Sequence, residues 1–273
     1  MPNFQTSSPY LESGATFHSL RSCKRNSESR SSFAPLSIRF YSPKFLILGM
    51  FIETIYCGST GMSTITYAHN YLDRLLMFEV HVWNYENLGA NIKVNSKKGP
   101  ESPDFHWNQE VEIEDKTWYK SGCIKEEETE GSGKPCVHIY YNQALPESLE
   151  LPENEPSKSF FFYMTIDTDK HNSYNDFELA KSLLSEDGIG ELLASNHTKN
   201  WAEIWDNGLI LLEGQDLDYK LQEAIIASFY YLYSSLPSAS SASQDDVYYG
   251  LSPGGIANGK AYQGHVFWDM VIV

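Results

Sequence analysis

The sequence predicts a β-rich fold that is followed by helices. Between residues 45 and 170, short runs of β-branched and aromatic residues are separated by turn-forming segments, a pattern typical of a β-sandwich. After residue 170 the apolar residues recur at intervals of three and four, which is the helical period. The strongest helical pattern covers 216–236 and is followed by Pro237. We therefore predict a β-sandwich over 45–170, a helical linker over 171–214 and a second, helical domain from 215.

Residues 1–44 differ in composition from the rest of the chain. They contain many serines and basic residues, few acidic residues and little apolar surface. Such a composition cannot bury enough apolar area to fold, so we predict a disordered Ser/Arg-rich leader. An organelle transit peptide is the alternative, since transit peptides are also rich in Arg and Ser and poor in acidic residues.

The charge balance narrows the possible partners. The chain has 36 acidic and 20 basic residues, a formal net charge of −16, which argues against nucleic acid or an anionic membrane as a partner. The longest apolar run, residues 45–52, is too short to span a bilayer. We expect a cytoplasmic protein that acts on a neutral ligand, with no cofactor and an oligomeric state that the sequence does not define.

The four cysteines are Cys23, Cys57, Cys123 and Cys136, and their spacing matches no zinc motif, so no metal site is expected. A disulfide bond between Cys123 and Cys136 is conceivable across the acidic segment between them. Free thiols are the preferred interpretation for a cytosolic protein.

The predicted strands alternate with polar loops. The strands are 45–57, 64–69, 74–83, 110–114, 117–124, 136–141 and 159–167, and the loops include 84–109, 125–134 and 146–157. In 74–83, the apolar side chains alternate with a second set that includes Glu79 and His81, which predicts a strand with one buried face. We interpret His69 and His81 as structural residues rather than metal ligands or catalytic groups.

Three helices are expected. The first covers 175–184, with Asn175 as its N-cap. In the second, over 196–205, Trp201 and Trp205 share one face. This face either packs on the sandwich, which we favour, or forms a sugar platform. The third covers 216–236, with an apolar face that includes Leu221 and Leu232.

A glycine-rich segment that becomes aromatic ends the sequence. Residues 251–255 are LSPGG and residues 264–269 are GHVFWD. Glycines let a backbone approach a ligand, and the rings of Phe267 and Trp268 beside the carboxylate of Asp269 suit a sugar pocket. Composition alone also fits a structural loop that leads into a buried element.

The two motifs together closely resemble glycoside hydrolase family 65, the family of acid trehalases and of maltose and trehalose phosphorylases. Residues 67–69 followed by Arg74, and residues 227–237, are also similar to segments of this family. The resemblance implies a galactose-mutarotase-like supersandwich, a helical linker and the first part of an (α/α)6 barrel. It also implies that Trp268 and Asp269 bind substrate.

The resemblance implies an inverting glycosidase, most similar to the members that release glucose from the glucosyl-galactosyl unit on collagen hydroxylysine, or from a related α-glucoside such as trehalose. The family's catalytic glutamates match no residue here, because only residues 270–273 follow Asp269. We therefore expect no catalytic residue in this sequence and little hydrolysis by it alone. The alternative is a non-catalytic carbohydrate-binding or interaction module built on the sandwich.

Overall fold

The computed structural model describes residues 36–38 and 47–234, apart from 95–98, 100, 115, 128–129, 132, 188–189 and 213–218. These residues form a mostly β structure with a few helices. The strands are β1 (Leu36–Ile38), β2 (Phe51–Cys57), β3 (Thr60–Ala68), β4 (Leu75–Asn84), β5 (Ala90–Lys93), β6 (Phe105–Trp107), β7 (Val111–Glu114), β8 (Thr117–Ile124), β9 (Cys136–Tyr141), β10 (Ser148–Leu151) and β11 (Ser157–Asp167). The helices are α2 (Lys170–Asp187), α3 (Glu191–Asp206) and α4 (Tyr219–Ser234).

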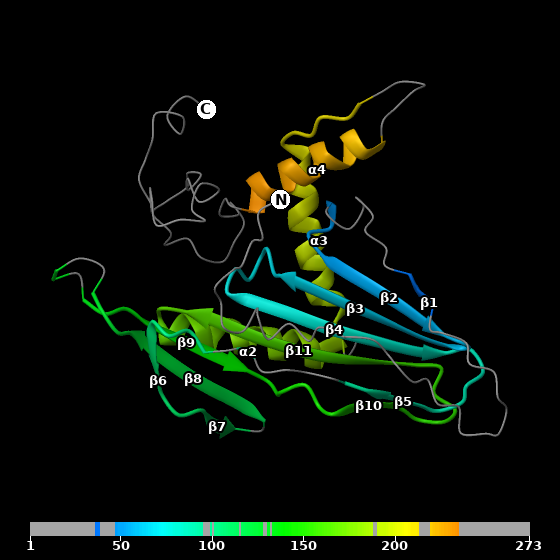
Figure 1. Cartoon of the computed structure of the whole chain (residues 1–273), viewed down its shortest axis with the longest axis horizontal. Helices are drawn as coiled ribbons and strands as arrows, with labels where there is room; N and C mark the ends of the chain where they lie inside the picture. Colours follow the sequence, from blue (N-terminus) through cyan, green and yellow to red (C-terminus); the bar gives the residue numbers. More distant parts are fainter. Residues whose placement is uncertain are drawn as a thin grey trace.

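One large antiparallel sheet organises the structure (Figure 1). Its strand order is β1-β2-β3-β4-β11-β9-β8-β6, and β7 pairs with β8 beside β6. Strands β10 and β5 form a separate two-stranded ribbon. Strand β1 lies within the predicted leader 1–44 and pairs with β2; the rest of that leader lies outside the described residues.

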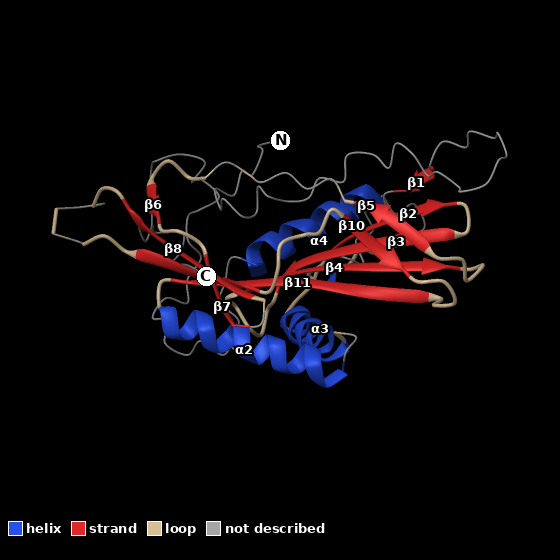
Figure 2. Cartoon of the chain, turned by 90° about the horizontal axis from the view of Figure 1, so that it is seen from below, coloured by secondary structure: helices blue, strands red, loops and turns tan. Residues whose placement is uncertain are grey.

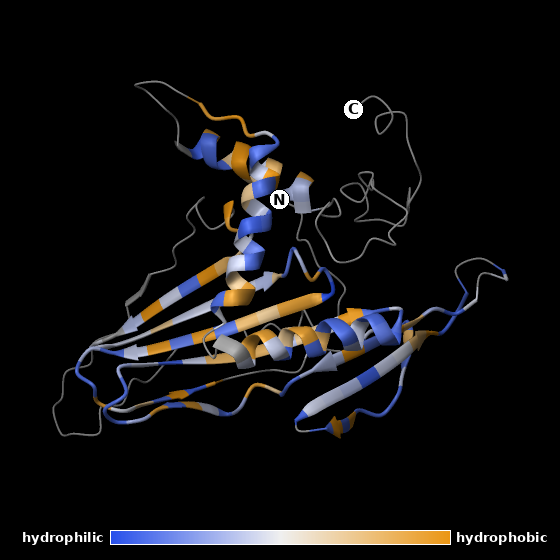
Figure 3. Cartoon of the chain, turned by 180° about the vertical axis from the view of Figure 1, so that it is seen from behind, coloured by the Kyte–Doolittle hydropathy of each residue, from blue (hydrophilic) through white to orange (hydrophobic). Residues whose placement is uncertain are grey.

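Helices α2 and α3 lie on one side of the sheet and the β5–β10 ribbon lies on the other (Figure 2). The core under the helices contains Leu72, Leu75, Met77 and Phe177, all at most 1% exposed. The core under the ribbon includes Val80, Val82, Ile92, Leu149 and Phe162. Apolar segments accordingly run along the central strands (Figure 3).

The two layers correct one sequence expectation. Strand β4 is central, between β3 and β11, and it buries side chains on both faces. The prediction of a single buried face for 74–83 is therefore wrong. On the helix side the buried Glu79 is accommodated by hydrogen bonds to Tyr67 and to the partly exposed His81.

Each predicted strand has a counterpart, although the first begins at Phe51 instead of residue 45, and four strands lie where none was predicted. One of them, β1, falls in the predicted leader. Strands β5 and β6 fall in 84–109, and β10 falls in 146–157. Each has only three or four residues, too few to show a period of two. The facing sheets of a full sandwich and the partial (α/α)6 barrel remain predictions.

The first helix begins earlier than predicted. Helix α2 starts at Lys170, and its cap is Asp169, whose Oδ1 accepts hydrogen bonds from the amides of His171 and Asn172 at 2.7 and 2.9 Å. These amide bonds hold the pKa of the Asp169 carboxyl below its usual value. Asn175 is therefore not the N-cap, and the apolar face of α2 is buried through Phe177 and Ala180.

Helices α3 and α4 pack against each other through aromatic rings. Trp201 and Trp205 lie on one face of α3 with ring centroids 5.9 Å apart, and both are nearly buried. The matching face of α4 is built from Ile226, Phe229, Tyr230 and Tyr233. The predicted face of 216–236 is wrong in part, because Leu221 and Leu232 are about half exposed in this structure.

Candidate functional site

The sequence-predicted sugar-binding residues Trp268 and Asp269 lie outside the described residues. Any site within the described residues must therefore be formed by other side chains. Four arrangements concentrate polar or aromatic groups there: an arginine network, a serine–histidine–glutamate chain, a histidine pair and an aromatic face of the sheet.

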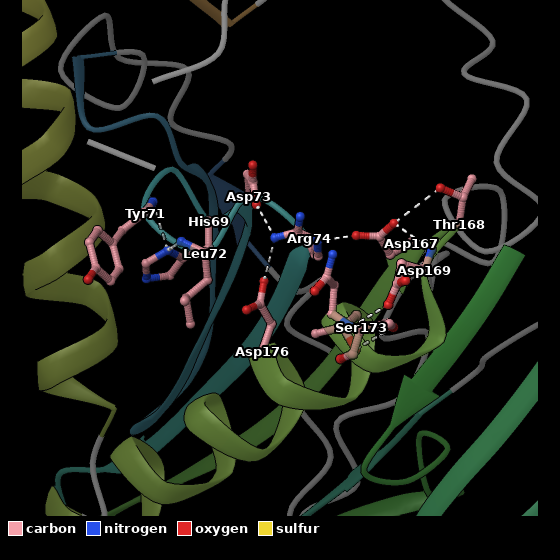
Figure 4. A network of polar contacts seen from close by, with 12 residues as sticks. His69, Tyr71, Leu72, Asp73, Arg74, Asp167, Thr168, Asp169, Ser173 and Asp176 are labelled. Atoms are coloured by element: carbon pink, nitrogen blue, oxygen red, sulfur yellow. Dashed lines mark hydrogen bonds and ion pairs between the residues drawn. The ribbon is translucent and has the colours of Figure 1, made fainter. Parts of the chain in front are cut away.

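The arginine network joins the sheet to α2 (Figure 4). The guanidinium of Arg74, in the turn just before β4, binds Asp167 at the end of β11. It also lies 3.1 Å from Asp73 and 3.3 Å from Asp176 of α2. Asp176 is buried, and this burial raises the pKa of its carboxyl while Arg74 opposes the rise. Three carboxylates around one cation are thus engaged in holding β4, β11 and α2 together.

A chain of hydrogen bonds crosses the helix side of the sheet. Tyr67 donates to Glu79 Oε1 at 2.7 Å, and Glu79 Oε2 lies 3.0 Å from His81 Nε2. His81 Nδ1 lies 2.7 Å from the hydroxyl of Ser159, its cross-strand partner. Burial and the Glu79 charge raise the pKa of the Tyr67 phenol, so this phenol stays a donor.

The connectivity Ser159–His81–Glu79 is that of a hydrolytic triad, but its setting differs. A triad serine is presented at a sharp turn beside amides that stabilise the oxyanion, whereas Ser159 lies within strand β11 opposite β4. Both oxygens of Glu79 are also engaged, one of them by Tyr67. The chain is best explained as the hydrogen bonding that a buried carboxylate requires.

Two buried histidines join the sheet to α3. His69 Nδ1 accepts hydrogen bonds from the amides of Tyr71 and Leu72, and its Nε2 lies 3.0 Å from the carbonyl of Leu193. His197 Nδ1 accepts from the Asn70 amide, and its Nε2 lies 3.2 Å from the carbonyl of Gly49. In both rings Nδ1 is therefore the acceptor and Nε2 the donor, the tautomer of a neutral imidazole.

Burial lowers the pKa of His69 to about 4 and that of His197 to about 3, the latter also through the neighbouring His69. The two rings are 5.5 Å apart, and neither exceeds 2% exposure. The interpretation of His69 as a structural residue agrees with these contacts. Its partner His197 could not have been identified from the sequence, because 128 positions separate them.

The fourth arrangement is an aromatic face on the ribbon side of β6, β8 and β9, made of Phe105, Trp107, Trp118, Lys120 and Tyr141. Phe105 and Trp107 are stacked at 5.1 Å, and Trp118 and Tyr141 at 6.4 Å. The Lys120 ammonium lies 4.9 Å from the Trp107 ring centre. Strand 117–124 was predicted, but Trp107 fell in a predicted loop, so the sequence alone did not bring these rings together.

Two of the cysteines form a disulfide bond, although free thiols were expected. Cys123 and Cys136 face each other across β8 and β9 and are bonded. Direct cross-strand partners are close enough to be bridged, and disulfide bonds persist in oxidising surroundings. The free-thiol interpretation is therefore wrong for this pair.

Removing this disulfide bond is expected to destabilise the protein. The bond closes a loop with a sequence separation of 13 residues, for which the chain-entropy model gives about 3 kcal/mol. We expect the double variant Cys123→Ala/Cys136→Ala to lose about 2–3 kcal/mol of unfolding free energy in urea. Reductant should lower the unfolding free energy of the unmodified chain to that of the variant. An unmodified chain whose unfolding free energy does not change with reductant would contradict the prediction.

No helix in the described ranges has both the length and the apolar character needed to cross a membrane. In the same residues no group of three or more His, Cys, Asp or Glu side chains is arranged to hold a metal ion.

The chain is similar to curated glycosidases. It is 27% identical over 232 residues to the protein-glucosylgalactosylhydroxylysine glucosidase of Danio rerio, covering 81% of this chain and 33% of the relative. It is 29% identical over 230 residues to the protein of that name from Gallus gallus, covering 81% and 31%. The chain thus spans about one third of the length of these relatives. No family model matches it.

A solved structure has the same fold. The "Putative kojibiose phosphorylase from human microbiome" superposes with a TM-score of 0.50 and 15% identity, covering 82% of this chain and 31% of the other. At this identity the likeness concerns the fold alone. Together the comparisons confirm the resemblance to glycoside hydrolase family 65 that the sequence motifs indicated.

Proposed function

We propose that this chain is the sheet-and-helix region of a carbohydrate-active protein that recognises a glucosylated disaccharide, and that its ligand is the glucosyl-galactosyl unit of collagen hydroxylysine. The observation that carries the proposal is the similarity to glucosidases named for that substrate over about four fifths of the chain. The alignment is long enough to include both the sheet and the helices described above.

The chemistry of the described residues supports a binding role over a catalytic one. An inverting glycosidase needs an acid and a base roughly 6.5–9.5 Å apart, with room for water between them. Asp73, Asp167 and Asp176 are instead held by Arg74. Glu79 is held by Tyr67 and His81. Glu79 and Asp176 are buried, and all four carboxylates are engaged in contacts that hold the scaffold together instead of facing a sugar.

We further propose that Trp268 and Asp269 contact the sugar, as the LSPGG and GHVFWD motifs imply. A tryptophan ring stacks on the apolar face of a sugar, and a carboxylate accepts hydrogen bonds from its hydroxyls. Such a pair supplies affinity and orientation, whereas hydrolysis also needs an acid that protonates the leaving oxygen.

The proposal is tested with the full chain and glucosyl-galactosyl-hydroxylysine. We expect calorimetry to detect binding, and Asp269→Asn to weaken it at least tenfold, while glucose release stays at the uncatalysed level. The matched control is Asp245→Asn, which removes a carboxylate from the preceding serine-rich segment. Absence of binding would contradict the proposed ligand, and glucose release that disappears in Asp269→Asn would contradict the non-catalytic role.

A further inference from the structure

We propose that the aromatic face on β6, β8 and β9 is a second carbohydrate-binding site, separate from the Trp268–Asp269 motif, which takes a short neutral oligosaccharide. The face consists of the stacked pair Phe105–Trp107, the stacked pair Trp118–Tyr141 and Lys120 between them. None of the functional assignments above uses these residues.

The register of the strands places the two ring pairs in one row. Trp118, Lys120 and Gly122 alternate with the residues of β8 that face α2, so they share the opposite face. Tyr141 is the cross-strand partner of Trp118, and Trp107 is the partner of Gly122. At about 3.3 Å per residue, the two pairs are roughly 13 Å apart along β8, a span that suits a chain of sugars.

Gly122 shows why the Trp107 ring lies flat against the sheet. A Cβ at this position would lie 2.5 Å from Cε3 of the indole, so only glycine lets the ring rest on the β8 backbone. Trp107 and Trp118 both remain partly exposed. Flat, partly exposed rings on a rigid strand are suited to stack against the apolar faces of sugar rings.

A charged pair between the rings supplies the polar contacts. Lys120 Nζ lies 2.6 Å from Glu101 Oε1; the lysine side chain is 5% exposed, whereas the glutamate is 49% exposed. The ammonium is thus fixed in place and the carboxylate reaches the rim. Carboxylate oxygens accept hydrogen bonds from hydroxyl groups, and a site that combines rings with fixed polar groups distinguishes sugars from plain hydrocarbons.

Aromatic platforms also bind single-stranded nucleic acids. The negative charge of this protein favours a neutral ligand over a nucleic acid. Single strands need a positively charged groove, but Glu112 and Glu114 of β7 are exposed beside this face and the chain carries a net charge of −16. The Lys120 ammonium is itself compensated by Glu101. A polyanion would be repelled, whereas a sugar without charge would not.

The disulfide bond on the opposite face of the same strands restrains the geometry of the site. Cys123 and Cys136 tie β8 to β9 on the α2 side, where Tyr119 and Tyr140 also pack. Locking these two strands fixes the separation of the rings on the opposite face. A pre-organised platform loses little conformational entropy on binding.

The experiment follows the indole N–H signals of the tryptophans in ¹⁵N-labelled full-length chain during titration with kojibiose and with glucosyl-galactose. We expect shifts at the Trp107 and Trp118 signals, with a Kd of roughly millimolar order as for small surface sites. Trp118→Ala should weaken binding at least tenfold, and Trp118→Phe should retain part of it because a flat ring remains. The matched control is Trp83→Ala, which removes a partly buried indole that packs on Gly61 elsewhere in the sheet.

The proposal is supported by shifts at both signals in the unmodified chain, by loss of the Trp107 shift in Trp118→Ala, and by persistence of both shifts in Trp83→Ala and Trp268→Ala. Binding that is lost only in Trp268→Ala overturns it while leaving the proposed function intact. No shift with either sugar, or shifts at these two signals only with single-stranded oligothymidine, also overturns it. The dispersion of the remaining indole signals shows whether each variant is folded.

Discussion

Lowering the pH from 6 to 4 is expected to remove about 4–5 kcal/mol of unfolding free energy through His69 and His197 alone. Both side chains are buried and neutral, with pKa values of about 4 and about 3 in the folded protein. In the unfolded chain the pKa of a histidine is near 6.5. The difference makes the junction between the sheet and α3 sensitive to acid.

The direction follows from proton binding. Between pH 6.5 and the folded pKa values, the unfolded state binds two protons that the folded state does not, so unfolding becomes more favourable as the pH falls. Each proton contributes a slope of about 1.4 kcal/mol per pH unit. Protonation also removes the Nδ1 acceptors that hold the amides of Leu72 and Asn70.

The measurement is urea unfolding at several pH values between 7 and 4. Replacing His197 with Gln is expected to lower the overall stability. It should also reduce the pH dependence of the unfolding free energy by about 1.4 kcal/mol per pH unit, the contribution of one proton. The control is His106→Gln, which changes an exposed histidine on β6 and should leave the slope unchanged. An equal slope in all three proteins would show that these buried rings do not govern the acid response.

The parts of the fold that were predictable are those with a local period. Helix α3 and strands β8, β9 and β11 follow from alternation or from helical spacing within single segments. The polar contacts between segments were not predictable in this way. His69 meets His197, and Trp107 rests on Gly122, because the sheet topology brings separate segments together. No spacing in the sequence encodes such pairs.

The same limit applies to the candidate sites. The C-terminal motif was recognised because its residues are contiguous, and it lies outside the described residues. The aromatic face escaped recognition because its rings come from three strands, and β6 is too short to show a pattern. The N-cap of α2 was predicted at the wrong residue for a related reason. Asn175 and Asp169 both have side chains that suit an N-cap, but β11 ends at Asp167, so the helix can begin directly after Asp169.

Gly49→Ala is expected to destabilise the protein by at least about 3 kcal/mol. Gly49 has φ of 65°, a conformation that costs an alanine roughly 1–2 kcal/mol. A Cβ at this position would also overlap the indole of Trp201, which is 3% exposed and cannot move into solvent without leaving the core between α3 and α4. The carbonyl of the same residue lies 3.2 Å from His197 Nε2, so a shift of this backbone would also disturb the buried histidine pair.

Gly58→Ala separates the two contributions. Gly58 has a similar φ of 60°, but no atom lies within 4 Å of the position that a Cβ would take, so only the backbone cost of roughly 1–2 kcal/mol is expected. The overlap itself is tested by the double variant Gly49→Ala/Trp201→Ala. Because removing the indole makes room for the new methyl group, the double variant should lose less stability than the sum of the two single variants. Additive losses, or equal losses for Gly49→Ala and Gly58→Ala in thermal and urea unfolding, would show that Trp201 does not fix the position of this turn.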